Sequence, residues 1–572
     1  MIAIDEALAH PLTAALARHA EDWARRCSAP EAAARALGRC VWALGLAMAE
    51  GHVCLLPGTR IGETTLAALT EELLASQLVA SEAQLAQGLK QPFVLDRQGR
   101  FYLYRYYDCE LRLAQLLAAR TGADGVEPVA DDGDDQARAV QVARVGRLTV
   151  ISGGPGTGKT TTVARILAAL LAETPALRVA LAAPTGKAAQ RMMEALRARA
   201  MAAELADRLP AASFTLHRLL GWQPTEGRFR HGRQRPLPYD LVVVDEASMI
   251  DLSLATHLLE ALAPAARLLL LGDRDQLAAV EKGVVFAELA RDDIEAPLRA
   301  SVVLLRRNYR FAADSGIGRL ATAINRGASD EAFALLRATA RDLVWRDIGE
   351  AHLPEGELAA LADGFAPYLA AVRQVRPTGD WQAAAAAHAA LAGYRILAAL
   401  RAGPRGAEGL NEEIDRRLRQ RLAAPAEGWH AGRAVVVLEN DYALGLFNGD
   451  TGIALPDADG RLQVVFPLAE GGWRAVAPAR LPRHAPAWAL TVHKAQGSEF
   501  SRIACVLPAA DAPVLTRELL YTAVTRARDH VTVIGSAARI LDAIDRRTQR
   551  AGGLSDRLGD CLAATTAPCH WG

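Results

Sequence analysis

Residues 153–160, Gly-Gly-Pro-Gly-Thr-Gly-Lys-Thr, restrict the fold of this chain more than any other segment. They match the pattern G-x-x-x-x-G-K-[ST], with an apolar run at 148–152 before them and a helix-compatible run after them. The glycines allow backbone N–H groups to converge on phosphate oxygens, and a helix that begins there adds the positive end of its dipole. This order predicts an α/β nucleotide-binding core. A glycine-rich turn without a ligand is the alternative, but it does not account for the flanking elements.

The residue types in this loop predict binding of a nucleoside triphosphate with Mg²⁺. Lys159 would neutralise charge on the β- and γ-phosphates, and Thr160 would place its hydroxyl on the metal. The candidate nucleotide-binding residues of this segment are Gly153, Gly154, Pro155, Gly156, Thr157, Gly158, Lys159, Thr160 and Thr161.

A second apolar run, 241–244, ends in Asp245 and Glu246. Acids at the carboxyl edge of a parallel sheet lie where such sheets bind ligands, so Asp245 would hold the magnesium shell and Glu246 would orient and deprotonate the attacking water. Alone, an acid pair at a strand end is more often a surface feature. Together with the loop it predicts hydrolysis, but a clamp loader, a transporter subunit, a GTPase and a helicase all remain open.

Short apolar runs alternate with helical segments after residue 148, which predicts a parallel sheet covered on both faces. The candidate strands are 148–152, 179–183, 241–244, 268–271 and 302–305, followed later by 503–507 and 531–534. The run 434–438, with turn signals at 448–450 and 457–460, predicts a small β-rich insert that continues to about residue 483. Before the core, alanine-rich helices such as 31–49 are expected, with a strand over 101–107 and an acidic linker at 131–135.

Bulk properties exclude several classes of protein. A chain of 572 residues is too long for one hydrophobic core, so three or four domains are expected. Lysine plus arginine and aspartate plus glutamate both number 65, so any nucleic-acid surface must be local. The seven cysteines form no C-x-x-C pair, which gives no signal for a zinc site or a disulfide framework. The acidic N-terminus and the lack of a long uninterrupted apolar stretch predict a cytoplasmic protein.

An ordered series of further motifs resembles the RecD-like family of superfamily 1 helicases, over nearly all of the chain after Gln136. The matching segments are 183–189, 215–221, 271–277, 307–311, 488–500 and 521–528. The segment 488–500, Trp-Ala-Leu-Thr-Val-His-Lys-Ala-Gln-Gly-Ser-Glu-Phe, is the most specific of them after the phosphate loop. By this resemblance the nucleotide is ATP.

The resemblance implies roles around the nucleotide. Gln136 would read the adenine, and Gln276 would sense the γ-phosphate. Arg310 and Arg526 would act as arginine fingers, which stabilise charge on the transferring phosphoryl group. The residues expected to lie toward the nucleotide from the fifth motif are Gln496, Gly497 and Glu499.

The resemblance also implies contacts with single-stranded DNA, for which the candidates are Thr185, Thr215, His217, Thr491, His493 and Lys494. The alternatives are that Thr185 caps the next helix and that His217 is a structural histidine. The basic stretch 228–235, with one aromatic residue, suits phosphate contact and base stacking, but a solvated loop is an equally good interpretation.

The fold class implied is α/β, with two RecA-like P-loop motor domains, a helical N-terminal domain and a small SH3-like β-barrel insert. The expected boundaries are 1–118 for the N-terminal domain, which would dock onto partners, and 130–305 for the first motor domain, with a small insert at about 222–239. The second motor domain would span 306–572, with the SH3-like insert at about 430–486.

The implied function is an ATP-dependent 5′–3′ DNA helicase that works on DNA ends in recombinational repair, as one subunit of a heterotrimer with RecB and RecC. Nuclease activity would then belong to a partner. A stand-alone RecD-like helicase is the main alternative. The docking-like segment around 51–56 and the lack of an evident helix-hairpin-helix tandem favour the subunit. A P-loop ATPase that switches or loads clamps without moving on DNA is the alternative from another class.

Overall fold

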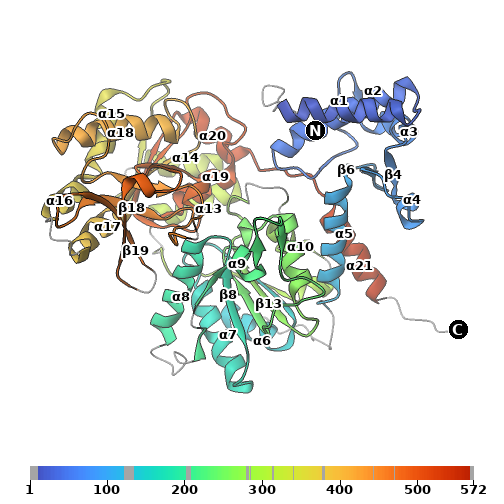
Figure 1. Cartoon of the computed structure of the whole chain (residues 1–572), viewed down its shortest axis with the longest axis horizontal. Helices are drawn as coiled ribbons and strands as arrows, with labels where there is room; N and C mark the ends of the chain where they lie inside the picture. The colour runs from blue at the N-terminus through green and yellow to red at the C-terminus, as the bar shows by residue number, and fades with distance from the viewer. Residues whose placement is uncertain are drawn as a thin grey trace.

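The computed structural model describes residues 11–121, 134–200, 208–210, 212–278, 283, 285–294, 296–311, 315–338, 340–375, 381–441, 443–468 and 471–566. Three predictions concern residues outside the described ranges. They involve the acidic N-terminus at 1–6, residues 131–133 of the predicted linker, and Cys569. Figure 1 shows two large α/β lobes, here called the first core (cyan to green) and the second core (yellow to red), with a smaller N-terminal region (blue) beside the first core.

The first core is built on a six-stranded, wholly parallel sheet of order β14-β7-β13-β12-β8-β9. In that order the strands are Val302–Leu305, Leu148–Gly153, Arg267–Gly272, Leu241–Val244, Val179–Ala183 and Phe214–Thr215. All five predicted strands are confirmed, and each is buried along most of its length because helices cover both faces of the sheet.

Alternate residues of these strands enter two separate hydrophobic clusters, as the period of two in a strand requires. One face packs against α6 (Asp135–Val145), α7 (Lys159–Glu173) and α8 (Gly186–Ala200). The other face packs against α9 (Leu216–Leu220), α10 (Leu252–Ala261) and α11 (Val285–Leu289). The short α12 (Ala296–Arg299) leads into β14, and a hairpin of β10 (Trp222–Gln223) and β11 (Arg228–Phe229) follows α9.

The second core has a five-stranded, wholly parallel sheet of order β15-β24-β23-β16-β22. In that order the strands are Leu343–Arg346, Ala527–Ile534, Phe500–Val506, Tyr394–Ala398 and Ala489–Thr491. Its helices are α13 (Gly316–Arg326), α14 (Ser329–Arg337), α15 (Glu355–Asp363), α16 (Ala366–Gln374), α17 (Ala384–Gly393), α18 (Ala407–Arg421), α19 (Arg517–Val524) and α20 (Ala537–Asp545). The two predicted strands of this region, 503–507 and 531–534, correspond to β23 and β24. Strands β15, β16 and β22 were not predicted.

The β-rich insert lies between α18 and β22 and forms an antiparallel sheet of order β20-β19-β18-β17-β21. In that order the strands are Trp473–Val476, Leu462–Pro467, Thr451–Pro456, Ala434–Val437 and His484–Pro486. Gly449 and Gly460 occur at the predicted turns with φ of 94° and 76°, which glycine adopts without steric cost. The insert has its own small hydrophobic cluster around Phe466.

The N-terminal region combines helices α1 (Pro11–Arg26), α2 (Glu31–Ala49), α3 (Thr70–Ala75), α4 (Glu82–Ala86) and α5 (Tyr104–Ala118) with two small sheets. The larger has the order β1-β6-β5-β4, with strands Cys54–Leu55, Phe101–Leu103, Phe93–Leu95 and Val79–Ser81, and the smaller pairs β2 (Arg60–Ile61) with β3 (Thr64–Thr65). The strand predicted over 101–107 ends at Leu103. Tyr104 begins α5, because helical spacing buries Tyr106, Tyr107 and Glu110 on one side.

Helix α2 is the one described helix that is long and apolar enough to cross a membrane. About 61% of its most apolar window is buried inside the protein, and it packs with α1 and the small sheet in one hydrophobic cluster. Glu31 and Arg39 also lie on it. These contacts are those of a core helix in a folded domain.

The C-terminal helix α21 (Leu554–Thr566) packs against α5 of the N-terminal region and against the first core (Figure 1). The buried side chain of Arg557 on α21 stabilises this contact by pairing with acids of the N-terminal region. Its guanidinium pairs with Glu82 at 2.8 Å, Asp96 at 3.0 Å and Glu110 at 3.4 Å, and lies 4.2 Å from the ring centre of Tyr107.

Replacing Arg557 with methionine is expected to destabilise the contact between α21 and the N-terminal region by about 3 kcal/mol, because it leaves buried carboxylates without their cation. The unfolding midpoint and the rate of proteolysis near α21 measure the effect. Arg97→Met is the matched control, since Arg97 pairs with Asp560 of the same helix at the surface, where a salt bridge contributes less than about 1 kcal/mol. Equal losses in both variants would contradict the assignment.

Candidate nucleotide site between the two cores

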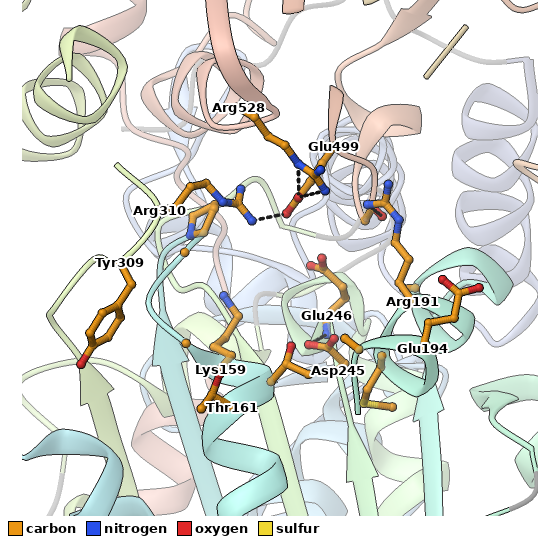
Figure 2. A pocket seen from close by; sticks show the side chains of 18 of the residues that line it. Lys159, Thr161, Arg191, Glu194, Asp245, Glu246, Tyr309, Arg310, Glu499 and Arg528 are labelled. Carbon is orange, nitrogen blue, oxygen red and sulfur yellow. Dashed lines mark hydrogen bonds and ion pairs between the residues drawn. The ribbon is translucent and has the colours of Figure 1, made fainter. Parts of the chain in front are cut away.

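A cavity of about 980 Å³ lies between the first and second cores. The first core contributes its floor, and Figure 2 shows Lys159, Asp245 and Glu246 on this side. The second core contributes Gly497, Glu499, Arg526 and Arg528. The remaining lining residues include Gln136, Pro155, Gly156, Gly158, Thr160, Thr161, Arg191, Glu194, Gln276, Tyr309 and Arg310.

The phosphate-loop sequence connects β7 to α7 as predicted. Gly156 and Gly158 both have φ of 85°, and a Cβ on Gly158 would lie 2.5 Å from the Gln136 side chain. The Nζ of Lys159 donates to the carbonyls of Gly153 at 2.6 Å and Gly154 at 3.2 Å. Gly158 is the N-cap of α7, so the positive end of the helix dipole points toward the cavity.

Asp245 and Glu246 follow β12 directly. Asp245 remains in line with the sheet, since its N–H donates to Ala182. Burial raises the pKa of Asp245 to about 6 with help from Glu246, although Lys159 opposes this. Glu246 has φ of 53°, a left-handed conformation that is uncommon for a residue other than glycine. The backbone turns there, and both carboxylates line the cavity.

The segment after β14 is hydrogen-bonded to the phosphate loop. Asn308 donates its side-chain amide to Pro155 O at 2.9 Å, and the N–H of Tyr309 donates to Gly156 O at 2.8 Å. The ring of Tyr309 and the amide of Gln136 both line the cavity. An aromatic face and an amide on the same wall can stack against a purine ring and hydrogen-bond its edge.

Glu499 lies between two arginines (Figure 2). Arg310 Nη2 contacts Glu499 Oε1 at 2.5 Å, and Arg528 Nη2 lies 2.9 Å from Glu499 Oε2. Burial alone would raise the pKa of Glu499, but the two guanidinium groups outweigh it and lower that pKa to about 2. Arg526 is buried and donates to Thr522 O and Ser498 O. The positive charge that an anion would meet here comes from Arg310, which precedes the second core, and from Arg526 and Arg528 within it.

Most predicted nucleotide residues come together around this cavity. Gly153, Gly154 and Thr157 belong to the same loop without being among its lining side chains. Gln496 is placed differently, since its side-chain amide donates to the carbonyl of Leu277 at 2.5 Å, outside the lining. Gln276 lines the cavity and donates to Asp273 Oδ2 at 3.0 Å.

Four residues that the sequence analysis did not single out also belong to this site: Asn308, Tyr309, Arg528 and Arg191. Arg191 lies on α8 and donates to Gly497 O at 2.9 Å, across the boundary between the cores. Asn308, Tyr309 and Arg528 stand inside quoted motifs, so proximity to Arg310 and Arg526 could have suggested them. Nothing in the helical pattern of α8 distinguishes Arg191 from a solvated arginine.

Three predicted DNA-facing threonines accept backbone N–H groups from the residue three positions ahead. Thr185 Oγ1 accepts from Ala188 at 3.3 Å, Thr215 Oγ1 from Arg218 at 3.2 Å and Thr491 Oγ1 from Lys494 at 3.3 Å. The contact of Thr185 is the one that the capping alternative describes, and Thr215 likewise caps α9. A hydroxyl that accepts one hydrogen bond still has its own proton to donate, so capping and phosphate contact are compatible.

The two predicted histidines lie in different surroundings. His217 is exposed and its ring centre lies 5.8 Å from that of Phe229 and 6.2 Å from that of Trp222. His493 is largely buried, and this burial, with Arg550 nearby, lowers its pKa to about 4. Lys494, its neighbour, is exposed. The structure thus presents Lys494 as an exposed cation at this point and His493 as a neutral ring.

The basic stretch forms part of the β10–β11 hairpin. Trp222 faces Phe229 across it with ring centres 5.0 Å apart. Arg228 pairs with Glu226, and Arg233 pairs with Glu260 at 3.1 Å. These acids neutralise part of the basic charge, whereas Trp222 remains 37% exposed beside the histidine.

Two family models match the chain in these regions. A model described as an AAA domain matches residues 136–282, and a model described as the UvrD-like helicase C-terminal domain matches residues 486–534. The first covers the phosphate loop, the acid pair and Gln276. The second covers Gln496, Glu499 and Arg526.

Curated relatives match most of the chain. The RecBCD enzyme subunit RecD of Mycolicibacterium smegmatis is 41% identical over 472 residues, which cover 80% of this chain and 81% of that protein. The same subunit of Mycobacterium tuberculosis is 42% identical over 80% of each chain. The ATP-dependent RecD2 DNA helicase of Deinococcus radiodurans is 34% identical, covering 94% of this chain and 70% of its own.

Similar solved structures include a Pif1 helicase from Bacteroides in complex with ADP-AlF3 and ssDNA, at 15% identity, 76% of this chain, 97% of that chain and a TM-score of 0.39. The assignment comes from the sequence relatives and not from this likeness. The prediction of a helicase is confirmed, and a P-loop ATPase that is not a motor is no longer an alternative. At 41% identity over four fifths of its length to curated RecD subunits, the chain belongs to the RecD family of ATP-dependent DNA helicases.

Proposed function

We propose that this chain translocates 5′ to 3′ along single-stranded DNA and separates duplex DNA, driven by ATP hydrolysis in the cavity between the two cores. One observation carries the proposal. The cavity has a phosphate loop and an acid pair on one wall and arginines of the opposite core on the other. An ATP molecule held there contacts both cores, so its hydrolysis changes how strongly they attract each other.

Thr160 and Asp245 fit Mg²⁺, since a hydroxyl and a carboxylate are the oxygen ligands that this ion prefers. The raised pKa of Asp245 supports this assignment, because it marks a buried carboxylate with little compensating positive charge. When bound, Mg²⁺ would supply positive charge to the β- and γ-phosphates. Lys159 would contact the same oxygens once it leaves the loop carbonyls.

Glu246 would orient and deprotonate the attacking water. It stands next to the metal ligand Asp245, and its unusual backbone conformation directs it into the cavity (Figure 2). Gln276 would respond to the γ-phosphate, and Arg310 and Arg526 would stabilise its charge as the bond to the β-phosphate breaks. Glu499 would position Arg310 and Arg528, and Gln136 and Tyr309 would hold the adenine.

DNA would bind along the segments that carry Thr185, Thr215 and Lys494. The insert adjoins this path, since a Cβ on Gly186 would lie 3.8 Å from Phe447. Lys187 lies there too, and burial together with Arg191 and Arg395 lowers its pKa to about 7, against the opposing charge of Asp450. The five-stranded insert would thus act as the SH3-like subdomain that helps to surround the strand. His217, Trp222 and Phe229 would add a stacking surface.

We also propose that the chain works in the cytoplasm as one subunit of a complex with RecB- and RecC-type partners, where a partner would supply nuclease activity. The names of the mycobacterial relatives support this. The N-terminal region would provide the docking surface, because Leu12, Leu16 and Trp23 are exposed on one side of α1, away from the buried Ala17 and Ala20. The similarity to the Deinococcus RecD2 helicase keeps a stand-alone enzyme as the alternative.

Changing Glu246 to glutamine is expected to lower ATP hydrolysis by about 10²- to 10⁴-fold, the usual contribution of a general base, with ATP affinity nearly unchanged. Single-turnover hydrolysis and binding of a fluorescent ATP analogue measure the two quantities. Glu194→Gln is the control, because Glu194 lies on the α8 wall of the same cavity and accepts from Gln190. Full activity in Glu246→Gln would remove this residue from the mechanism.

The purified chain should unwind a duplex with a 5′ single-stranded tail and leave a duplex with only a 3′ tail intact. Its ATP hydrolysis should rise when single-stranded DNA is added, because the strand would contact both cores and favour closure of the cavity. A gel assay of the two substrates checks polarity. Unwinding from the 3′ tail would reverse the proposed direction.

Replacing Trp23 by glutamate should weaken co-purification with RecB- and RecC-type subunits from the same organism, since a charge would be buried in the interface. Unwinding by the isolated chain should be unaffected. Leu89→Glu is the control, because Leu89 is exposed to a similar degree elsewhere in the N-terminal region. Tight association of the Trp23 variant, or no association of the native chain, would favour another docking surface or the stand-alone enzyme.

A further inference from the structure

Residues 273–277, here called the sensor loop, leave the first core at the end of β13 and contact the second core at several points. Asp273 Oδ2 accepts from the hydroxyl of Tyr521 at 3.0 Å, and Asp275 Oδ2 accepts from the Asn325 amide at 3.4 Å. Tyr521 lies on α19 and Asn325 on α13. The loop therefore touches two helices of the opposite core.

Leu277 has the closest attachment. Its N–H donates to Thr522 Oγ1 at 2.8 Å, and its carbonyl accepts from Gln496 Nε2 at 2.5 Å. Side chains of the second core thus pair with both backbone polar groups of this one residue. Since an unpaired buried backbone group is costly, these two hydrogen bonds specify where Leu277 lies.

The side chain of Leu277 is only 4% exposed and belongs to the hydrophobic cluster of the second core. All other members of that cluster lie between Ile317 and Ile544. Leu277 is therefore joined by the chain to the first core and packed in the core of the second. Movement between the cores must either carry the sensor loop along or pull Leu277 out of an apolar site.

The preceding residue faces the nucleotide. Gln276 lines the cavity, its Nε2 donates to Asp273, and its Oε1 is buried without a hydrogen-bond partner among the described residues. On the other side, the carbonyl of Thr522 accepts from Arg526 Nε at 3.2 Å, and Arg526 also lines the cavity. A continuous series of contacts therefore links Gln276 through its neighbour Leu277 to Thr522, and Thr522 to Arg526. Both ends of this series line the cavity.

We propose that Leu277 is a positioning residue that fastens the sensor loop to the second core, and that its bond to Thr522 couples the state of the nucleotide to movement between the cores. Leu277 lines no part of the nucleotide cavity, so it acts through Gln276 and Thr522. This inference rests on the proposed function as a translocating motor. It adds the element that transmits each hydrolysis event.

Thr522→Val tests the proposal with one change of atom type, because valine has nearly the shape of threonine and lacks the hydroxyl that accepts from Leu277. The number of base pairs opened per ATP hydrolysed is expected to fall at least about fivefold, the lower end of typical coupling between two sites. ATP affinity without DNA should change less than about twofold. Thr522→Ser, which keeps the hydroxyl, should restore the native ratio.

Thr525→Val is the matched control. Thr525 is buried on the same turn of chain, but its hydroxyl donates to Tyr521 O and Thr522 O, both within the second core. Its ratio of base pairs opened to ATP hydrolysed should equal that of the native chain. Leu277→Ala should lower the ratio as Thr522→Val does, and the unfolding midpoint checks that both variants remain folded.

The possible outcomes distinguish a failure of the proposed function from a failure of the positioning role of Leu277. A native chain that hydrolyses ATP without opening duplex DNA would overturn the proposed function. If the native chain does unwind DNA and Thr522→Val loses unwinding and hydrolysis in equal proportion, the positioning role is wrong. An equal fall of the ratio in Thr525→Val would likewise overturn it, since the effect would then come from α19 in general.

Discussion

Every strand of a parallel sheet ends at the same edge, and the proposed nucleotide site of this protein depends on that constraint. In the first core the segments that follow β7, β12, β13 and β14 carry Lys159, Asp245, Gln276 and Arg310. These residues are far apart in the chain, yet the sheet order places their strands side by side. Because the edge belongs to a rigid, fully covered sheet, the groups are held in place before any ligand arrives, which reduces the cost of binding.

The second core meets this edge with different parts of its own sheet. Glu499 precedes β23, and Arg526 and Arg528 stand at the beginning of β24. The first core thus offers backbone N–H groups, Lys159 and an acid pair, whereas the second adds the guanidinium groups of Arg526 and Arg528. A triphosphate needs both kinds of partner, so it binds best when the cores are close. In the proposed mechanism, hydrolysis removes the γ-phosphate from between the cores and weakens that attraction, so the chemical step produces a movement.

Much of this arrangement could be predicted from local pattern. The phosphate loop and the acid pair each follow directly on an apolar run, an order that is typical of α/β nucleotide-binding folds. The five apolar runs predicted in the first core are strands of its sheet. Prediction was weaker where tertiary contact overrides local preference. Tyr104 and its neighbours have β-forming side chains but belong to α5, since one helical face of them is buried. Strands β15, β16 and β22 were not predicted, and β16 begins directly after the alanine-rich helix α17.

By itself the sequence determined which chemistry to expect, because the residue types and the spacing within each motif predict the groups that would act on phosphate and water. Only the tertiary structure decided which groups meet. Gln496 stands three residues from Glu499, yet one reaches the Leu277 carbonyl and the other joins two arginines at the cavity. Arg191 reaches Gly497 only because α8 packs against the opposite core. Such contacts depend on how the two separately packed sheets are placed relative to each other. The spacing of residues along the chain does not determine that placement.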